Sequence, residues 1–320
     1  MTSTGALVRL LAPLDTERLE SLYPDVDFAT LSRDDAPVTF LRGATVVVAD
    51  WRKRIRIDDE LADALASTCR LVQVMGAGLD AVDVVACAER GIRVAACGGL
   101  NAVSVAEWCI WATIDTLRSA TRSDRELRAG EWSQFTRPRH ELIDKKVGMV
   151  GMGAIGQETA RRLSAFGTTT SYWSRTRRSA NLESQLGLQY RELDHLIRES
   201  DVLILAIDLT PDTRQLISRE RIRVMKAGSI LVNATRGAVL DQRALVEALH
   251  DGHLAGAALD TFETEPLAPD HPLTTLESAV LTPHIAGPTV ESVQRILNRV
   301  HHNIAAALDG TLIEGEVRPH

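Results

Sequence analysis

The sequence predicts an α/β protein of two domains, each built on a doubly wound parallel sheet. Three observations support this prediction. The chain has 320 residues, which is more than one domain usually holds. Short β-branched runs alternate with helical stretches along most of it, and a second such series begins after the charged stretch 144–146. Because strands that alternate with helices usually pair in parallel, both series favour sheets with helices on both faces.

The first series occupies the first hundred residues. We expect strands at 45–49, 71–74 and 94–96, and helices at 58–67 and 82–90. The second of these strands ends in Gly76-Ala77-Gly78, a glycine turn that opens a helix and whose backbone N–H groups could hold an anion. From the spacing alone, an ordinary tight turn is the favoured interpretation.

A long helical pattern runs from Val103 to Arg128 and ends where Gly130 interrupts it. Its apolar residues, among them Trp108 and Trp111 about one turn apart, lie on more than one face, so the helix must be buried. Three arrangements would bury it: a crossing between the two domains, packing against a second copy of the chain, or packing within one core.

The second series predicts the larger sheet. We expect strands at 147–150, 168–173, 202–207, 229–233, 255–260 and 279–282, with a helix at 157–166 after the first strand and a final helix at 290–308. Six strands with helices between them are typical of a doubly wound sheet. The final helix follows the last strand and could therefore cap either domain.

Composition excludes several classes of function. With 45% hydrophobic and 25% charged residues, the chain has the balance of a globular protein. A formal charge of -7 argues against nucleic acid as a partner. The four cysteines form no CxxC pair, so neither a metal site nor a disulfide framework is indicated. Because no signal peptide and no membrane-spanning apolar run is evident, we expect a cytoplasmic protein without membrane contact.

The strongest motif is a glycine-rich turn directly after the strand at 147–150. It reads Gly151-Met152-Gly153-Ala154-Ile155-Gly156, a GxGxxG pattern placed between a strand and a helix. In such a turn the first glycine allows the tight bend, the second lets a pyrophosphate approach, and the third lets helix and strand pack closely. We therefore predict that Gly151, Gly153, Ala154, Ile155 and Gly156 bind a dinucleotide.

The loop after the next strand predicts which dinucleotide is preferred. An NAD site usually places an acidic residue there to bind the ribose hydroxyls, and this chain has none. Instead Ser174, Arg175, Arg177 and Arg178 offer a hydroxyl and three guanidinium groups, which suit a 2′-phosphate. The sequence thus favours NADP(H) over NAD(H), with an ordinary solvated basic loop as the alternative.

Three later segments each carry one polar group at the end of an expected strand. They supply Arg236, Glu265 and His284. In a parallel sheet the carboxyl ends of the strands share one edge, so we expect these groups to converge beside the dinucleotide. An arginine can clamp a carboxylate and polarise a carbonyl, and a glutamate beside a histidine favours an imidazolium that can donate a proton.

The order of these motifs resembles the D-isomer-specific 2-hydroxyacid dehydrogenases. The resemblance runs from about Leu71 to Thr289 and includes the glycine turn at 76–80, the GxGxxG motif, 233–237, 259–266 and 282–285. It implies that Arg236, Glu265 and His284 are catalytic, and that Asp260 is the acidic residue near the nicotinamide and the histidine. Within the family, the loop at 173–176 is most similar to the NADPH-dependent glyoxylate/hydroxypyruvate reductases. The implied activity is therefore reduction of a small 2-keto acid to the D-2-hydroxy acid.

The resemblance also implies an organisation and further contacts. It implies two Rossmann-like domains: a discontinuous substrate domain of residues 1–100 and 289–320, and a dinucleotide-binding domain of residues 101–288 that forms a two-fold homodimer. The substrate contacts would be Ala77, Gly78, Arg236 and His284. The further cofactor contacts would be Thr213, Ala234, Thr235 and Gly287, together with Asp260. Trp51 is a candidate for the substrate pocket, although core packing is the favoured interpretation.

Two alternatives remain open at the level of the sequence. One is an NADH-dependent enzyme of the D-lactate or phosphoglycerate type, against which the arginine loop argues. The other is a corepressor-like protein that senses NAD(P), because such proteins share the fold and the three polar residues. The sequence also departs from the family pattern at Ala206, Asp208 and Gly287-Pro288, which affects the expected contacts beside the nicotinamide.

Overall fold

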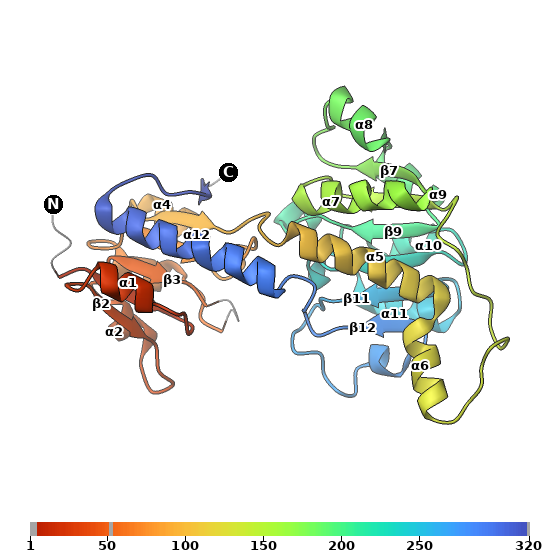
Figure 1. Cartoon of the computed structure of the whole chain (residues 1–320), viewed down its shortest axis with the longest axis horizontal. Helices are drawn as coiled ribbons and strands as arrows, with labels where there is room; N and C mark the ends of the chain where they lie inside the picture. The colour runs from red at the N-terminus through yellow and green to blue at the C-terminus, as the bar shows by residue number, and fades with distance from the viewer. Residues whose placement is uncertain (1–4, 51–53, 319–320) are drawn as a thin grey trace. The chain divides into compact units, whose positions relative to one another are not determined.

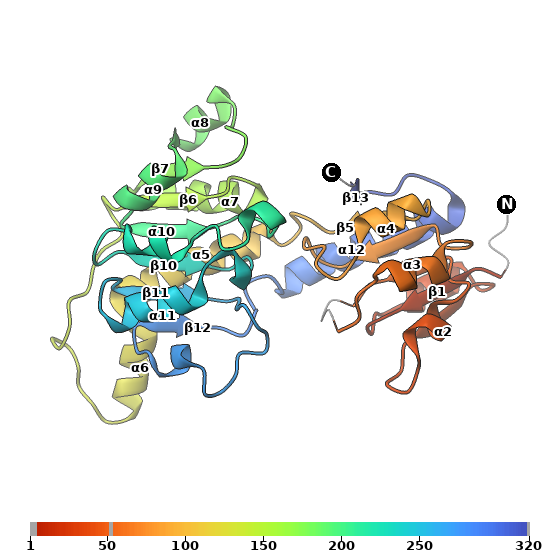
Figure 2. The same ribbon diagram turned by 180° about the vertical axis from the view of Figure 1, so that it is seen from behind.

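The computed structural model describes residues 5–50 and 54–318. The chain divides into two compact units, Met1–Leu100 with Val290–His320 and Asn101–Thr289 (Figures 1 and 2). Each unit has its own sheet and its own hydrophobic core, and the predicted α/β fold class is confirmed. No helix of the described residues is long and apolar enough to cross a membrane.

The first unit contains a six-stranded sheet in the order β13-β5-β4-β3-β1-β2. All neighbours are parallel except β13, which pairs antiparallel with β5. The strands are β1 (Leu7–Leu10), β2 (Asp27–Thr30), β3 (Val46–Val48), β4 (Leu71–Val74), β5 (Arg93–Ala96) and β13 (Glu316–Val317). The helices are α1 (Glu17–Leu22), α2 (Pro37–Leu41), α3 (Asp59–Leu65), α4 (Val84–Glu89) and α12 (Val290–Asp309).

Two apolar clusters cover the two faces of this sheet. Residues of α2, α3 and α4 pack on one face, and residues of α1 and α12 pack on the other. A buried polar contact fixes α12, because the Asn303 amide donates to Gln73 Oε1 of β4 at 2.6 Å. The last helix therefore belongs to the first unit, although it follows the last strand of the second.

The second unit contains a seven-stranded parallel sheet in the order β12-β11-β10-β9-β6-β7-β8. Its strands are β6 (Lys146–Val150), β7 (Thr169–Trp173), β8 (Gln189–Tyr190), β9 (Val202–Leu205), β10 (Ile230–Asn233), β11 (Gly256–Leu259) and β12 (Ala279–Leu281). Its α-helices are α5 (Ala102–Arg118), α6 (Ala120–Arg128), α7 (Ala154–Leu163), α8 (Ala180–Leu186), α9 (Leu193–Glu199), α10 (Arg219–Arg223) and α11 (Gln242–His250). The short 3₁₀ helices are η1 (Ser164–Phe166), η2 (Pro211–Thr213), η3 (Gly237–Val239) and η4 (Pro272–Thr275).

The strand order places the glycine motif at a special position in this sheet. Strand β6 lies between β7 and β9, so the chain winds outward from it in both directions. In open α/β sheets the carboxyl edge at such a reversal is the usual place for a ligand. The six expected strands of this series are confirmed, and the seventh, β8, is a two-residue edge strand that the sequence pattern did not reveal.

The predicted single helix from Val103 to Arg128 is wrong in one respect. Ser119 adopts a left-handed backbone with φ of 52° and separates α5 from α6. The cause is a competing cap, because Asp115 Oδ1 accepts the Thr121 backbone N–H at 2.8 Å and its hydroxyl at 2.9 Å. Helix α5 packs in the core of the second unit, where Trp108 is buried. Core packing is confirmed for Trp108, whereas Trp111 is 43% exposed, and the other two arrangements stay predictions.

Candidate active site

The turn after β6 combines two crowded glycines with one open glycine. Gly151 has φ of 102°, and a Cβ there would lie 2.1 Å from the Ala206 carbonyl oxygen. A Cβ at Gly156 would lie 2.5 Å from the Gly151 carbonyl oxygen. A Cβ at Gly153 meets nothing within 4 Å, and α7 starts at the next residue without a side-chain cap. Open space at a helix N-terminus fits the pyrophosphate of a dinucleotide.

The basic loop after β7 lies directly against this turn. Arg178 Nε donates to the Met152 carbonyl oxygen at 2.9 Å, which joins the loop to the glycine motif. The buried Ser174 hydroxyl donates to the Thr176 carbonyl at 2.7 Å. Arg177 forms a bidentate ion pair with Glu183 of α8, whereas Arg175 is exposed and has no partner within the described chain. The arginines that the sequence presented as equivalent are therefore in different environments.

Asn233, at the end of β10, shapes the loop that carries Arg236. Its side-chain oxygen accepts the N–H and the hydroxyl of Thr235, each at 3.0 Å, and its amide donates to the Arg236 carbonyl. Arg236 itself is half-buried. At Gly237 the chain passes so close to the next loop that a Cβ would lie 1.9 Å from the Phe262 carbonyl carbon. This contact brings the Arg236 loop against the segment that leads to Glu265.

Asp260, at the end of β11, fixes the loop that carries His284. Its carboxylate is fully buried and accepts the Thr282 hydroxyl at 2.5 Å and the N–H groups of Ile285 and Ala286 at 2.8 Å each. The His284 N–H donates to the Asp260 carbonyl at 2.9 Å. His284 has φ of 58°, a conformation uncommon for a residue with a side chain. The surrounding hydrogen bonds compensate for it, so Asp260 is a structural anchor of this loop.

His284 and Glu265 form a hydrogen-bonded pair above the ends of β11 and β12. His284 Nδ1 lies 2.8 Å from Glu265 Oε2, and Glu265 Oε1 accepts the Phe262 N–H at 3.0 Å. The two side chains are 40% and 36% exposed, so both can be reached from solvent. Because Nδ1 is engaged by the carboxylate, Nε2 is the nitrogen that can face a substrate.

The family of the chain follows from a comparison with known proteins. The protein-family model described as "D-isomer specific 2-hydroxyacid dehydrogenase, NAD binding domain" matches residues 110–286, which form most of the second unit. The chain belongs to the D-isomer-specific 2-hydroxyacid dehydrogenases. As a member of this family it is an oxidoreductase that uses a nicotinamide cofactor, and its second unit contains the cofactor-binding domain.

Individual dehydrogenases are similar over most of their length. A glyoxylate reductase of Thermofilum pendens is 38% identical over 262 residues, which are 80% of this chain and 77% of that protein. An (S)-sulfolactate dehydrogenase of Chromohalobacter salexigens is 37% identical over 283 residues, or 88% and 91% of the two chains. The structure of a glyoxylate reductase from Paecilomyes thermophila has a TM-score of 0.89 at 30% identity and covers 98% of each chain. The names of these relatives favour a catalyst over a sensor of the cofactor.

The remaining residues expected to contact ligands in this dehydrogenase have varied surroundings. Thr213 is buried, and its hydroxyl accepts the Thr210 N–H at 2.7 Å and donates to the Asp208 carbonyl at 2.6 Å, so it stabilises its own turn. Ala234 is buried beside Thr235, and a Cβ at Gly287 would lie 2.8 Å from the Asn101 amide nitrogen.

Ala77 and Gly78 follow β4 in the first unit. Within the described chain, their N–H groups donate to no acceptor, as an anion-binding turn requires. Trp51, another residue that the sequence offered for the substrate pocket, lies outside the described residues.

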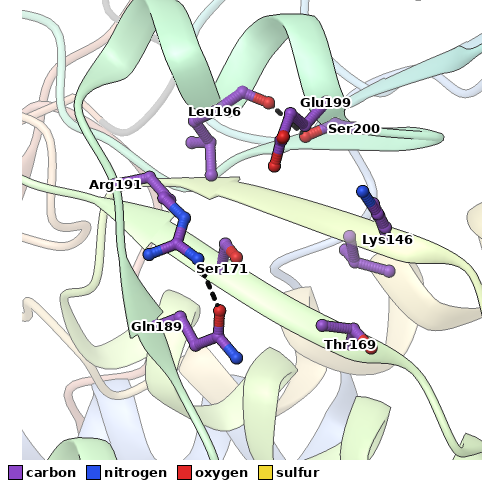
Figure 3. Close-up of a pocket in the computed structure, with 9 residues that line it drawn as sticks. Lys146, Thr169, Ser171, Gln189, Arg191, Leu196, Glu199 and Ser200 are labelled. Carbon is purple, nitrogen blue, oxygen red and sulfur yellow. Dashed lines mark hydrogen bonds between the residues drawn. The ribbon is translucent and has the colours of Figure 1, made fainter.

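A hollow in the dehydrogenase lies at the edge of the larger sheet opposite the candidate active site (Figure 3). It has a volume of about 120 Å³ and opens at the amino ends of β6, β7 and β8. Lys146, Thr169, Gln189, Arg191 and Glu199 are among the residues that line it. The glycine motif, Arg236, Glu265 and His284 all follow the carboxyl ends of their strands, so this hollow is separate from the candidate active site.

The cysteines of the dehydrogenase are not suited to nucleophilic chemistry. Cys69, Cys87, Cys97 and Cys109 are all buried and free. Burial raises the pKa of the Cys69 and Cys109 thiols to about 12, so both remain protonated near neutral pH. The arginine, the glutamate and the histidine therefore remain the candidates for the chemistry of the site.

Proposed function

We propose that this dehydrogenase reduces glyoxylate, hydroxypyruvate or a similar small 2-keto acid to the D-2-hydroxy acid, with NADPH as the preferred donor. The observation that carries the proposal is the hydrogen bond between His284 Nδ1 and Glu265 Oε2, at the sheet edge that also carries the glycine motif and Arg236. The glyoxylate reductases among the relatives support this class of substrate. We also propose that the protein acts in the cytoplasm.

Each polar group has a distinct role in the proposed reaction. When bound, a dihydronicotinamide would supply the hydride for reduction of the keto carbon. His284 donates the Nε2 proton to the keto oxygen, and Glu265 stabilises the imidazolium through Nδ1. Arg236 binds the substrate carboxylate and polarises the carbonyl. The N–H groups of Ala77 and Gly78 hold the same carboxylate, so residues 1–100 and 289–320 act as the substrate domain and residues 101–288 as the dinucleotide-binding domain.

The preference for NADPH rests on the loop after β7. It lacks an acidic residue at its start and presents the exposed Arg175 beside the glycine motif. A guanidinium binds a dianionic phosphate through charge-assisted hydrogen bonds, and a carboxylate in the same place would repel it. Ser174 and Arg175 are therefore the residues proposed to bind the 2′-phosphate.

We further propose a homodimer built on the second unit. The segment after α6 carries Trp132 and Phe135, which are 78% and 89% exposed. Arg139 holds this segment by donating to the Gln134 carbonyl at 2.8 Å and to the Ser133 carbonyl at 3.3 Å. Large aromatic side chains presented on a fixed segment are typical of interface residues.

A single set of assays tests the proposed reaction. The purified chain is incubated with glyoxylate, hydroxypyruvate and 3-sulfopyruvate, each with NADPH and with NADH. We expect turnover of at least one keto acid, a higher kcat/KM with NADPH, and a fall of kcat by about 100-fold or more in His284→Ala. Retention of near-normal turnover in His284→Ala would contradict the proton-donor role, and tight NADPH binding without turnover would indicate a sensor instead.

A further inference from the structure

Glu183 lies at the centre of a hydrogen-bonded cluster beside the cofactor loop. Its Oε1 accepts the Tyr172 hydroxyl at 2.8 Å and Arg177 Nε at 2.9 Å, and its Oε2 accepts Arg177 Nη2 at 2.8 Å. The Arg177 guanidinium also lies 5.5 Å from the centre of the Tyr190 ring. Glu183 and Tyr172 are buried, whereas the Arg177 side chain is 63% exposed, so Glu183 is a fixed anchor for an arginine at the surface of the loop.

The cluster changes the charge that the loop presents. Hydrogen bonds from Arg177 and Tyr172 lower the pKa of Glu183 to about 2, so its carboxylate is ionised throughout the physiological range. An ionised glutamate in a bidentate pair cancels the charge of Arg177 at short range. The loop therefore presents two uncompensated arginines, Arg175 and Arg178.

These two arginines also differ from each other. Arg178 is fastened at two points, because its N–H donates to the Tyr172 hydroxyl at 2.8 Å and its Nε donates to the Met152 carbonyl at 2.9 Å. Its guanidinium thus braces the glycine turn. Arg175 is exposed and has no partner within the described chain.

We propose that Glu183 is a positioning residue that sets the cofactor specificity of this enzyme. It holds Arg177 away from the 2′-phosphate, so that Arg175 is the arginine that binds this group. Arg178 attaches the loop to the glycine turn. The inference rests on the proposed preference for NADPH and makes it more specific. It implies that the preference is smaller than a loop of three unpaired arginines would give, and that removal of the Glu183 charge increases it.

The test measures binding of two nucleotide fragments by titration calorimetry. Adenosine 2′,5′-bisphosphate carries the 2′-phosphate and 5′-AMP does not, so the ratio of their Kd values reports recognition of that phosphate without turnover. We expect Glu183→Gln to lower the Kd of the bisphosphate about fivefold, because an unpaired guanidinium then acts on the dianion, with the Kd of 5′-AMP within about twofold of wild type. In the holoenzyme, the KM for NADPH should fall while kcat stays constant.

Further variants separate this role from a structural one. Arg175→Gln should weaken bisphosphate binding about tenfold or more, whereas Glu183→Gln/Arg177→Gln, which removes both charges of the pair, should change it by no more than about twofold. The double variant Glu183→Gln/Arg177→Gln should lose the gain of Glu183→Gln. Glu199→Gln is the charge-matched control, because Glu199 lies at the amino edge of the same sheet and should leave both Kd values unchanged. Thermal unfolding of each variant reports whether it is folded.

The outcomes distinguish this inference from the proposed function. If Glu183→Gln leaves the ratio of Kd values unchanged or weakens bisphosphate binding, or if Glu183→Gln/Arg177→Gln loses as much affinity as Arg175→Gln, the inference is overturned. If the wild-type chain binds both fragments equally, the proposed NADPH preference fails. In that case the inference is supported if Glu183→Gln creates a preference for the bisphosphate, and it is overturned if Glu183→Gln does not.

Discussion

At the scale of single residues, the candidate site depends on a buried side chain, Asp260, that holds the loop of His284. The two carboxylate oxygens of Asp260 accept the Thr282 hydroxyl before His284 and the backbone N–H groups of Ile285 and Ala286 after it. The resemblance implied that Asp260 lies near the nicotinamide and the histidine, and the structure places it beside His284. Its fully buried carboxylate, however, is occupied by the 282–286 loop. Its main contribution is therefore to keep the imidazole in one orientation.

The substitution Asp260→Asn tests this role. One acceptor oxygen becomes an NH₂ group that faces a backbone N–H, which leaves buried donors unpaired and costs about 1–3 kcal/mol of unfolding free energy. We expect a lower midpoint in urea unfolding and a fall in kcat, since the His284 loop loses its anchor. Thr282→Val is the matched control, because it removes one donor and leaves both N–H contacts of Asp260. Equal stability and equal turnover of Asp260→Asn and wild type would show that the anchor is dispensable.

At the scale of helices and strands, the structure shows which elements a sequence pattern can reveal. Strands β4, β6 and β10 consist of short apolar runs bounded by polar or glycine residues, and all three were predicted. The series β1, α1, β2 and α2 was not, because each of these elements has only four to six residues and β1 includes the polar Arg9. The break at Ser119 was missed for a different reason: it depends on the Asp115 side chain, and the sequence has neither glycine nor proline there.

The candidate site likewise has some features that the sequence pattern reveals and others that it does not. Arg236, Glu265 and His284 could be predicted because each follows a predicted strand of a parallel sheet, where the strand ends share an edge. The contact between Arg177 and Glu183 could not, because it joins a loop to a helix that begins after it and no periodic spacing reports such a pair. Thr213 was expected at the cofactor, and the structure shows its hydroxyl occupied within its own turn.

The turn between β6 and α7 allows a prediction with a built-in comparison. Gly153→Ala should fold as wild type does, because its Cβ meets nothing within 4 Å, yet its methyl group enters the space proposed for the pyrophosphate. We expect an unchanged Tm and a KM for the cofactor raised about tenfold or more. Gly151→Ala should instead lower the Tm, because its Cβ would lie 2.1 Å from the Ala206 carbonyl oxygen at a φ of 102°. Equal cofactor KM values for Gly153→Ala and wild type would place the pyrophosphate elsewhere.

At the scale of the whole molecule, the exposed aromatic residues lead to a prediction about assembly. Trp132 and Phe135 lie on the segment between α6 and β6, and Leu127 of α6 is also exposed. An ion pair between Arg137 and Glu126 fastens this segment to α6. An apolar surface held in a fixed conformation loses little conformational entropy on association, so it favours binding to a second copy.

The double substitution Trp132→Ser/Phe135→Ser should shift the protein toward monomers in sedimentation-velocity measurements at micromolar concentration. The free energy of unfolding of each unit should change little, because neither side chain is buried within the chain. Leu312→Ser is the matched control: Leu312 is 76% exposed but belongs to the first unit, and its loss should leave the dimer intact. A wild-type chain that sediments as a monomer, or a double variant that remains dimeric, would exclude this segment as the dimer interface. The reductase assay on the same samples then shows whether the assembled state is needed for turnover.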